Sequence, residues 1–216
     1  MFIARSEDLD HIFTGVEIQS QVDEPNHSTF KQGFRCPICG QNVTYSHSSL
    51  NRPFEYFTHV NNREDCFSDD SMSDEHRLAE EITVKTLYNR LEEVTGVQPE
   101  IDVEKRIGTS SDFVITDVRV RSPLRITAEV FYKSERLGLK RRLTTLFKHN
   151  YQTYLIFHTD GKHDVDRIEQ TIKCISPLRI GRFHPEILDL SLGDLFNERQ
   201  IDLHSPDKDS LPNYII

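Results

Sequence analysis

The sequence is short of cysteine, of long apolar runs and of positive charge, and each shortage argues against a class of protein. Only four of the 216 residues are cysteine, which argues against a secreted scaffold built on disulfides. No apolar run approaches the roughly 18 residues that a membrane-spanning helix needs, and residues 1–10 carry early charges in place of the apolar region of a cleavable signal. We therefore expect a soluble, cytoplasmic protein that contacts no membrane.

Positive charge is scarce overall but concentrated locally. The formal net charge of −9 does not suit a protein that coats nucleic acid nonspecifically, so any contact with DNA has to come from a patch. Between residues 133 and 149 the bases greatly outnumber the acids. The residues of this run that we predict to bind nucleic acid are Arg136, Lys140, Arg141, Arg142 and Lys148. A solvated helix face is the alternative interpretation.

Two cysteines with metal-ligand spacing are the most informative motif. Cys36 and Cys39 are separated by two residues and followed by Gly40, which points both sulfurs into one concavity. His59 and Cys66 supply a second pair, so we predict that these four side chains bind one structural Zn²⁺. A redox pair and a chance CxxC are the alternatives. The histidines that could replace one ligand are His27, His47 and His76.

Turn residues and periodicity divide the chain into three parts. We expect residues 1–70 to form short strands and a zinc-ribbon module, 71–176 a core domain, and 177–216 an extension that packs on the core. The core begins with a helix capped by Ser73 that runs to about Thr95, with Gly96 just beyond its end. The elements expected after it are strands at 100–107, 113–120, 126–132 and 151–158, a basic helix at 137–148 and a further helix over 165–175.

This α-β-β-β-α-β-α order, with acids on its second and third strands, resembles the PD-(D/E)XK nuclease superfamily. With Cys36-Pro37-Ile38-Cys39 ahead of it and Asp74-Glu75-His76 at the start of its first helix, the chain looks most like the competence protein CoiA-like family. The resemblance covers about residues 30–175. It implies an α/β (α+β) fold with a restriction-endonuclease-like core, in which helices flank a mixed central sheet, plus a small N-terminal zinc ribbon.

In such a family, carboxylates on the first helix, the second strand and the third strand hold a divalent metal, which implies these roles for Glu75, Asp112 and Glu129. Oxygen ligands suit Mg²⁺ or Mn²⁺, and a metal-bound water can attack phosphorus. Where the family has lysine or glutamine two residues after the glutamate, this chain has Phe131. Lys133 is the candidate replacement, because it shares the strand face of Glu129 if the strand continues that far.

The choice of aspartate has a competitor. Counting residues through the turn at 121–123 brings Asp117, not Asp112, nearest Glu129. We favour Asp112 because residues 106–111 match the family's approach to its aspartate.

The predicted function is metal-dependent hydrolysis of DNA in recombination, DNA uptake or defence, with structural Zn²⁺ and catalytic Mg²⁺ or Mn²⁺. The alternative is a DNA-binding accessory protein that keeps the nuclease fold without cleaving, because Phe131 stands at the usual lysine position. A zinc-stabilised protein-interaction module is a third hypothesis. The expected partners are DNA and recombination or processing proteins.

Overall fold

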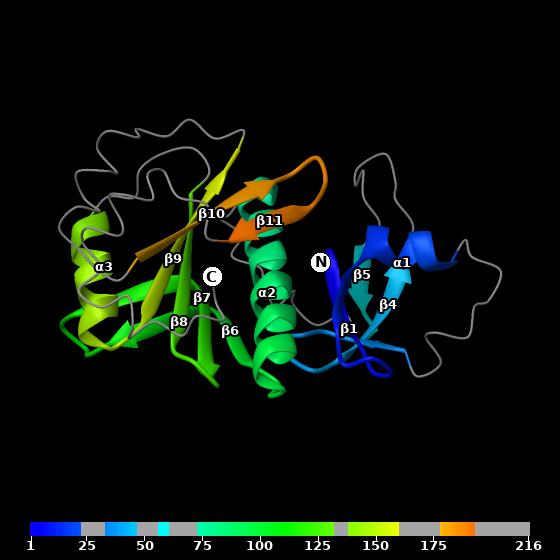
Figure 1. Cartoon of the computed structure of the whole chain (residues 1–216), viewed down its shortest axis with the longest axis horizontal. Coiled ribbons are helices and arrows are strands. Elements are labelled where there is room, and N and C mark those ends of the chain that lie inside the picture. Colours follow the sequence, from blue (N-terminus) through cyan, green and yellow to red (C-terminus); the bar gives the residue numbers. More distant parts are fainter. Residues whose placement is uncertain (23–32, 47–55, 61–72, 132–137, 160–177, 193–216) are drawn as a thin grey trace.

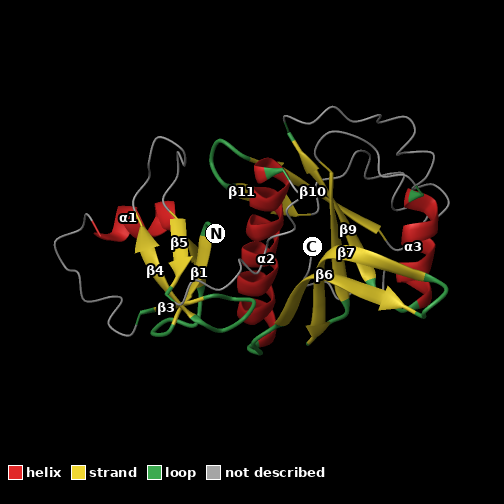
Figure 2. Cartoon of the chain, turned by 180° about the vertical axis from the view of Figure 1, so that it is seen from behind, coloured by secondary structure: helices red, strands yellow, loops and turns green. Residues whose placement is uncertain are grey.

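Two β-sheets share one long helix as the centre of the packing. The computed structural model describes residues 1–22, 33–46, 56–60, 73–131, 138–159 and 178–192. Over these residues the chain is a mixed α+β protein in which helix α2 (Asp74–Thr95) stands between the two sheets (Figure 1). The view from behind shows the same arrangement of first sheet, α2 and second sheet (Figure 2).

The first sheet is small and antiparallel, with strand order β2-β1-β3-β4-β5. Its elements are β1 (Ile3–Ser6), β2 (Ile12–Thr14), α1 (Gly15–Val22), β3 (Phe34–Arg35), β4 (Asn42–Ser46) and β5 (Tyr56–His59). Helix α1 follows β2 directly. Its first turn is fixed because the side chains of Thr14 and Glu17 each accept a hydrogen bond from the other's backbone N–H, as in a capping box.

Helix α2 has the ends that the sequence predicts. Ser73 caps its N-terminus by accepting a hydrogen bond from the backbone N–H of His76, and Gly96 follows its C-terminus in the left-handed conformation, with a φ of 65°. Every residue from Leu78 to Val84 is buried, which requires cover on all sides of the helix. The helix is therefore buried on more than one side.

Polar contacts as well as apolar packing join the first sheet to α2. The side-chain amide of Asn89 accepts from the backbone N–H of Ile12 at 2.9 Å and donates to its carbonyl at 2.8 Å, as a neighbouring strand would. Glu81 of α2 accepts a hydrogen bond from the backbone N–H of Phe2. Buried residues of both sheets and of α2 belong to one apolar cluster, so the two sheets fold around a common core.

The second sheet is mixed, with strand order β11-β10-β9-β8-β7-β6. Its strands are β6 (Glu100–Gly108), β7 (Phe113–Ser122), β8 (Ile126–Phe131), β9 (Gln152–His158), β10 (Leu178–His184) and β11 (Asp189–Leu192). Strands β6, β7 and β8 form an antiparallel meander, whereas β8, β9 and β10 run parallel. Parallel neighbours need a crossover, and α3 (Leu139–Lys148) lies in the one between β8 and β9.

The element order from α2 to β9 agrees with the order expected from the sequence. Two features differ: α1 lies in a segment where only strands and turns were expected, and β10 and β11 extend the second sheet beyond residue 177. The helix expected over 165–175 lies outside the described residues. In the part of the chain that the structure describes, no helix is long and apolar enough to cross a membrane.

Candidate metal centre and acidic site

The loop between β3 and β4 presents two cysteines on a tight turn. Gly40 donates its backbone N–H to the Cys36 carbonyl at 2.9 Å, and the Cys36 N–H donates to the Gln41 carbonyl at 2.8 Å. Gly40 adopts a φ of 70°, a left-handed conformation that favours glycine. Gly40 in the sequence therefore marks the turn that brings Cys36 and Cys39 together.

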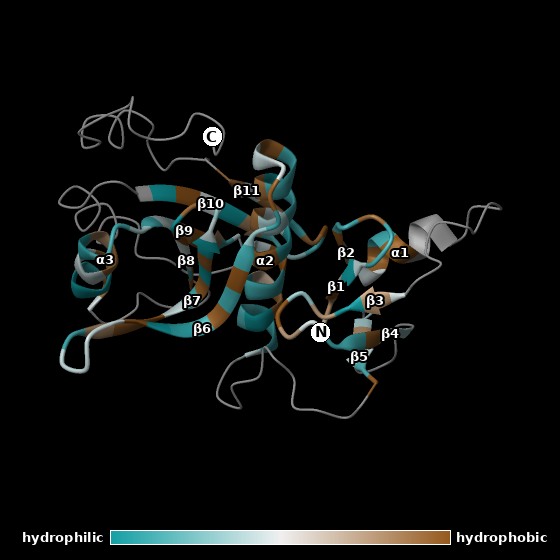
Figure 3. Cartoon of the chain, turned by 90° about the horizontal axis from the view of Figure 1, so that it is seen from below, coloured by the Kyte–Doolittle hydropathy of each residue, from teal (hydrophilic) through white to brown (hydrophobic). Residues whose placement is uncertain are grey.

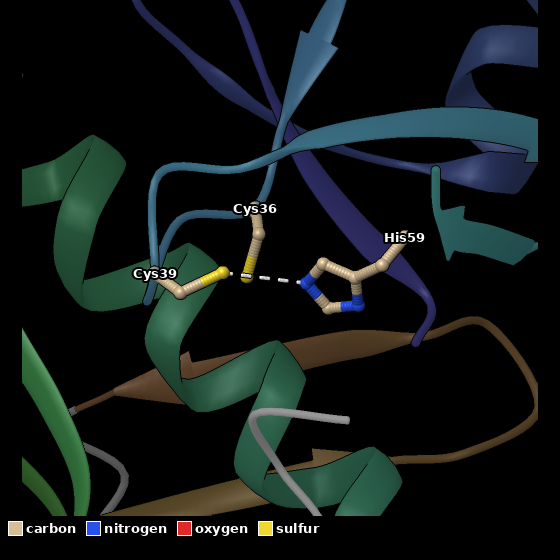
Figure 4. A group of neighbouring side chains, drawn as sticks. All are labelled: Cys36, Cys39 and His59. Atoms are coloured by element: carbon tan, nitrogen blue, oxygen red, sulfur yellow. Dashed lines mark hydrogen bonds between the residues drawn. The ribbon is translucent and has the colours of Figure 1, made fainter. Parts of the chain in front are cut away.

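Strand β5 brings His59 to this turn (Figure 4). Strand β4 continues from the turn and pairs with β5, so that His59 lies opposite Val43. The Nε2 atom of His59 is 3.4 Å from the Sγ atom of Cys39. One ligand atom from each of Cys36, Cys39 and His59 lies within 4.8 Å of the other two, and Cys36 is buried whereas Cys39 is exposed. These three side chains could hold a metal ion.

The donor set is compatible with zinc. Zn–S and Zn–N bonds of about 2.3 and 2.0 Å in a tetrahedral site separate sulfur from nitrogen by about 3.5 Å. The observed separation of 3.4 Å between Cys39 and His59 is close to that value. Burial lowers the pKa of His59, which keeps its imidazole in the neutral form that binds metals.

The predicted fourth ligand, Cys66, lies outside the described residues, as do the alternative ligands His27 and His47. The other alternative, His76, is described and contacts Asp117 of β7. In the part of the chain that the structure describes, one group of three or more histidine, cysteine, aspartate or glutamate side chains has its ligand atoms within 4.8 Å of one another. This group is Cys36, Cys39 and His59.

A second polar site lies where β7 and β8 separate. The ladder between these strands ends at the pair Val118↔Ala128, although β8 continues to Phe131. Beyond that pair the side chain of Asp117 takes the place of a backbone acceptor, because its Oδ2 atom accepts the Val130 N–H at 2.6 Å. Asp117 is only 3% exposed. Its carboxylate is therefore fixed in the interior, beside the backbone of β8.

Glu129, the residue before Val130 on β8, is a second buried acid and is 0% exposed. Arg142 of α3 donates to its Oε2 atom through Nε at 3.0 Å and through Nη2. The same Nη2 donates to the Ile115 carbonyl at 2.5 Å. An isolated buried carboxylate is costly, so this guanidinium offsets a large desolvation penalty. The acid that stands out in the apolar 126–131 strand is thus an interior residue and not a surface one.

The register corrects the preference for Asp112 as the strand partner of Glu129. Strands β7 and β8 are joined by a short turn over residues 123–125, so Val118 pairs with Ala128 and Asp117 is the acid next to β8. Asp112 lies before β7, where its Oδ1 atom is 3.5 Å from Nη2 of Arg141 and 3.4 Å from Oγ1 of Thr145. The count of residues through the turn was the better guide.

The α2 residue that reaches this site is His76. Its Nε2 atom lies 3.7 Å from Oδ2 of Asp117, whereas Glu75, the predicted ligand, is exposed in the first turn. Glu80 follows His76 by one helical turn and is 0% exposed. Sequence reasoning named His76 only as an alternative zinc ligand and did not name Glu80 as a site residue. The signal that could have identified their common face is the helical spacing of two titratable residues, four positions apart.

The basic residues of α3 divide between two roles. Lys140, Arg141 and Lys148 are exposed, as a DNA-contacting patch requires. Arg142 instead forms the ion pair with Glu129, and its side chain is 19% exposed. Lys133 and Arg136, the remaining predicted residues, lie outside the described part of the chain.

Comparison of the chain with protein-family models, curated proteins and solved structures found no match.

Proposed function

We propose that the chain is a metal-dependent DNA nuclease, with Asp117 and Glu129 as the carboxylates of its active site and a structural zinc ion on Cys36, Cys39 and His59. The observation that carries the proposal is the pair of buried acids where β7 and β8 separate, with exposed fractions of 3% for Asp117 and 0% for Glu129. Because burying carboxylates is costly, two of them on neighbouring strands favour a functional role.

The order of elements supports this function. Helix α2, the meander β6-β7-β8, the crossover helix α3 and the parallel strand β9 follow one another. This is the order of the restriction-endonuclease-like core that the sequence resembles, in which the acids of the second and third strands act together. Those two strands correspond here to β7 and β8.

The cofactor proposed for this site is a hard divalent cation. Carboxylate oxygens suit Mg²⁺ or Mn²⁺, and a bound ion would supply an activated water and neutralise charge developing on phosphorus. The chain itself orients the Asp117 carboxylate through the Val130 N–H at 2.6 Å. It also holds the His76 imidazole 3.7 Å from Asp117.

Cleavage of end-labelled DNA in Mg²⁺ or Mn²⁺ tests the proposal, with Asp117→Asn and Asp112→Asn as a matched pair. The amide that replaces the Asp117 carboxylate would keep an oxygen for the Val130 N–H while losing the charge, so we expect activity to fall by roughly a hundredfold or more. Asp112→Asn should retain activity, because Asp112 contacts Arg141 and Thr145 instead. Undiminished cleavage by Asp117→Asn would reject this site.

A DNA-binding accessory role is the second candidate, and two contacts favour it. Arg142 already neutralises Glu129, and Phe131, at the family's lysine position, stacks on Phe157 with ring centroids 5.1 Å apart. A stacked core phenylalanine contributes no charge to the site. If wild-type protein binds DNA but cleaves no single-stranded, duplex, nicked or branched substrate with either metal, this role replaces the nuclease.

A further inference from the structure

The tip of the β6–β7 hairpin exposes an aromatic and aliphatic surface. Figure 3 shows this tip beside α3, with hydrophobic residues at the start of β7. Phe113 is 40% exposed and Ile115 is 48% exposed. The residue between them, Val114, is buried with Leu146 and Tyr151 on the side that packs against α3. Because side chains alternate across a strand, Phe113 and Ile115 occupy the opposite, solvent-facing side of the hairpin.

Phe113 is paired with a residue that cannot cover it. Its cross-strand partner is Gly108, which has a φ of 116° and no space for a side chain, because a Cβ there would lie 2.3 Å from the Asp112 carbonyl oxygen. The absence of a side chain opposite Phe113 is therefore built into the turn. Phe113 keeps 40% of its surface exposed.

A guanidinium lies over the exposed ring. The Cζ atom of Arg106 is 3.8 Å from the centroid of Phe113, and Nη2 of Arg106 donates to the Thr109 carbonyl at 2.7 Å. The hydrogen bond holds the planar cation in position. An aromatic ring and an arginine at one exposed place offer both a surface on which a base can stack and a charge for phosphate.

On the solvent-facing side of the hairpin, Arg106 is exposed and brings a positive charge to Phe113, against a net charge of −9 for the whole chain. Lys105 is exposed on the same hairpin, whereas Lys140 and Arg141 are exposed on α3, which packs against the other side of the hairpin. The acid at the tip, Asp112, is partly buried and already faces Arg141 at 3.5 Å. The local charge therefore suits a polyanion.

We propose that this stacking surface, formed by Arg106, Phe113 and Ile115, binds single-stranded nucleic acid. Single strands present base faces, whereas a duplex keeps its bases stacked on one another. Phe113 precedes Asp117 by four residues on β7, about 13 Å along an extended strand. That single strands are the substrate of the acidic site rests on the proposed nuclease function; the binding itself does not.

Fluorescence anisotropy without added Mg²⁺ or Mn²⁺ tests the binding, using a labelled oligothymidylate and an abasic strand of the same length. Wild type should prefer the oligothymidylate. Phe113→Ala should weaken that complex by about tenfold, the scale expected for loss of one stacking partner, and leave the abasic complex unchanged. Phe113→Tyr should restore the preference, and the control Ile187→Ala, at a residue 69% exposed on the β10–β11 turn, should have no effect.

Three outcomes would overturn the inference. Equal affinity of wild type for both strands would mean that the surface attracts nucleic acid by charge and does not stack on bases. If wild type binds neither strand, the hairpin does not bind nucleic acid, and a protein partner becomes the alternative. Loss of the preference in Phe147→Ala but not in Phe113→Ala would move the stacking surface to α3, where Phe147 is 50% exposed. Cleavage without a thymidylate preference would reject this inference alone, whereas a preference without cleavage would reject the nuclease alone.

Discussion

The cysteine–histidine cluster of the first sheet and the acidic site of the second both gather metal-binding groups, but they differ in how their charges are balanced. In the acidic site the protein supplies the balance, because Arg142 pairs with Glu129 and the Val130 N–H bonds Asp117. In the cluster, two thiols and an imidazole come within 4.8 Å of one another, and thiolates at that distance repel unless a cation joins them.

From this difference we predict that metal would act on the two sheets in different ways. The strands of the first sheet are short, and the turn that carries Cys36 and Cys39 connects two of them. A metal bound at this turn would therefore contribute directly to folding. The second sheet is long-stranded and carries its own ion pair, so a metal there would act on a framework that is already stable. Metal removal should therefore affect the stability of one region and only the chemistry of the other.

The largest effect expected from this comparison is loss of the zinc site. Cys39 is exposed, so Cys39→Ser removes a ligand with little change in packing. We expect zinc content to fall sharply and the free energy of unfolding to fall by several kcal/mol, since structural zinc binding is worth on the order of 10 kcal/mol. Elemental analysis and thermal unfolding provide the measurements.

Cys174→Ser is the matched control for this experiment, because Cys174 lies outside the predicted ligand set. It should retain zinc and unfold like wild type. If purified wild-type protein contains no zinc and Cys39→Ser leaves the unfolding temperature unchanged, the cluster is not a structural metal centre.

The second prediction concerns the internal balance of the acidic site. Arg142→Ala removes the guanidinium from a carboxylate that is 0% exposed, and breaking such a pair costs about 3–5 kcal/mol. Adding Glu129→Gln to Arg142→Ala should recover part of this loss, because the buried charge is gone. Urea unfolding measures both changes.

Arg141 is the control that the helix itself provides. It is adjacent to Arg142, but its side chain is 69% exposed, so Arg141→Ala should change the unfolding free energy by about 0.5 kcal/mol or less. Similar losses of unfolding free energy for Arg141→Ala and Arg142→Ala would mean that the ion pair between Arg142 and Glu129 does not stabilise the second sheet.

The fold was predictable wherever the sequence carries a local signal. Ser73 and Gly96 fix the ends of α2, and apolar runs with turn residues between them mark the strands of the meander. Helix α1 also has a local signal, the Thr14–Glu17 capping box. It was missed because the helix is short and follows β2 without a loop.

The sites were predictable only as far as local geometry determines them. The turn after Cys36 and the pairing of β4 with β5 bring three of the predicted ligands together. The contact of His76 with Asp117, in contrast, depends on how α2 packs across β7, which no spacing in the sequence specifies. Asp112 was preferred from a family pattern, whereas the short turn after β7 determines the register.

The third prediction sharpens the assignment of α3. Lys140 and Arg141 are exposed while Arg142 is committed to Glu129, so the double variant Lys140→Ala/Arg141→Ala should weaken DNA binding without weakening the fold. Removing one side chain that binds a phosphate should reduce the slope of log affinity against log salt by roughly one unit. Anisotropy titrations at several salt concentrations measure this slope. An unchanged slope would show that this face is merely solvated.

The smallest expected effect is at the junction between the two regions, where Glu17 of α1 pairs with Lys85 of α2. Burial alone would raise the pKa of Glu17, but hydrogen bonds from Lys85 and Thr14 outweigh it and lower the pKa below 4.5. A lowered folded-state pKa adds stability above the unfolded value, and this stability is lost as pH falls through the folded value. Because the Glu17 side chain is 44% exposed, Glu17→Gln should cost about 1 kcal/mol or less at pH 7.

The difference between Glu17→Gln and wild type should therefore shrink as the pH falls from 4.5 through the lowered folded-state pKa, since the wild-type carboxylate then becomes protonated and no longer favours the folded state. Urea unfolding at neutral and acidic pH measures it. Glu93→Gln removes the partner of Arg90 from an exposed pair and should have little effect at either pH. A difference for Glu17→Gln that persists undiminished in acid would mean that the side chain joins α1 to α2 by packing rather than by charge.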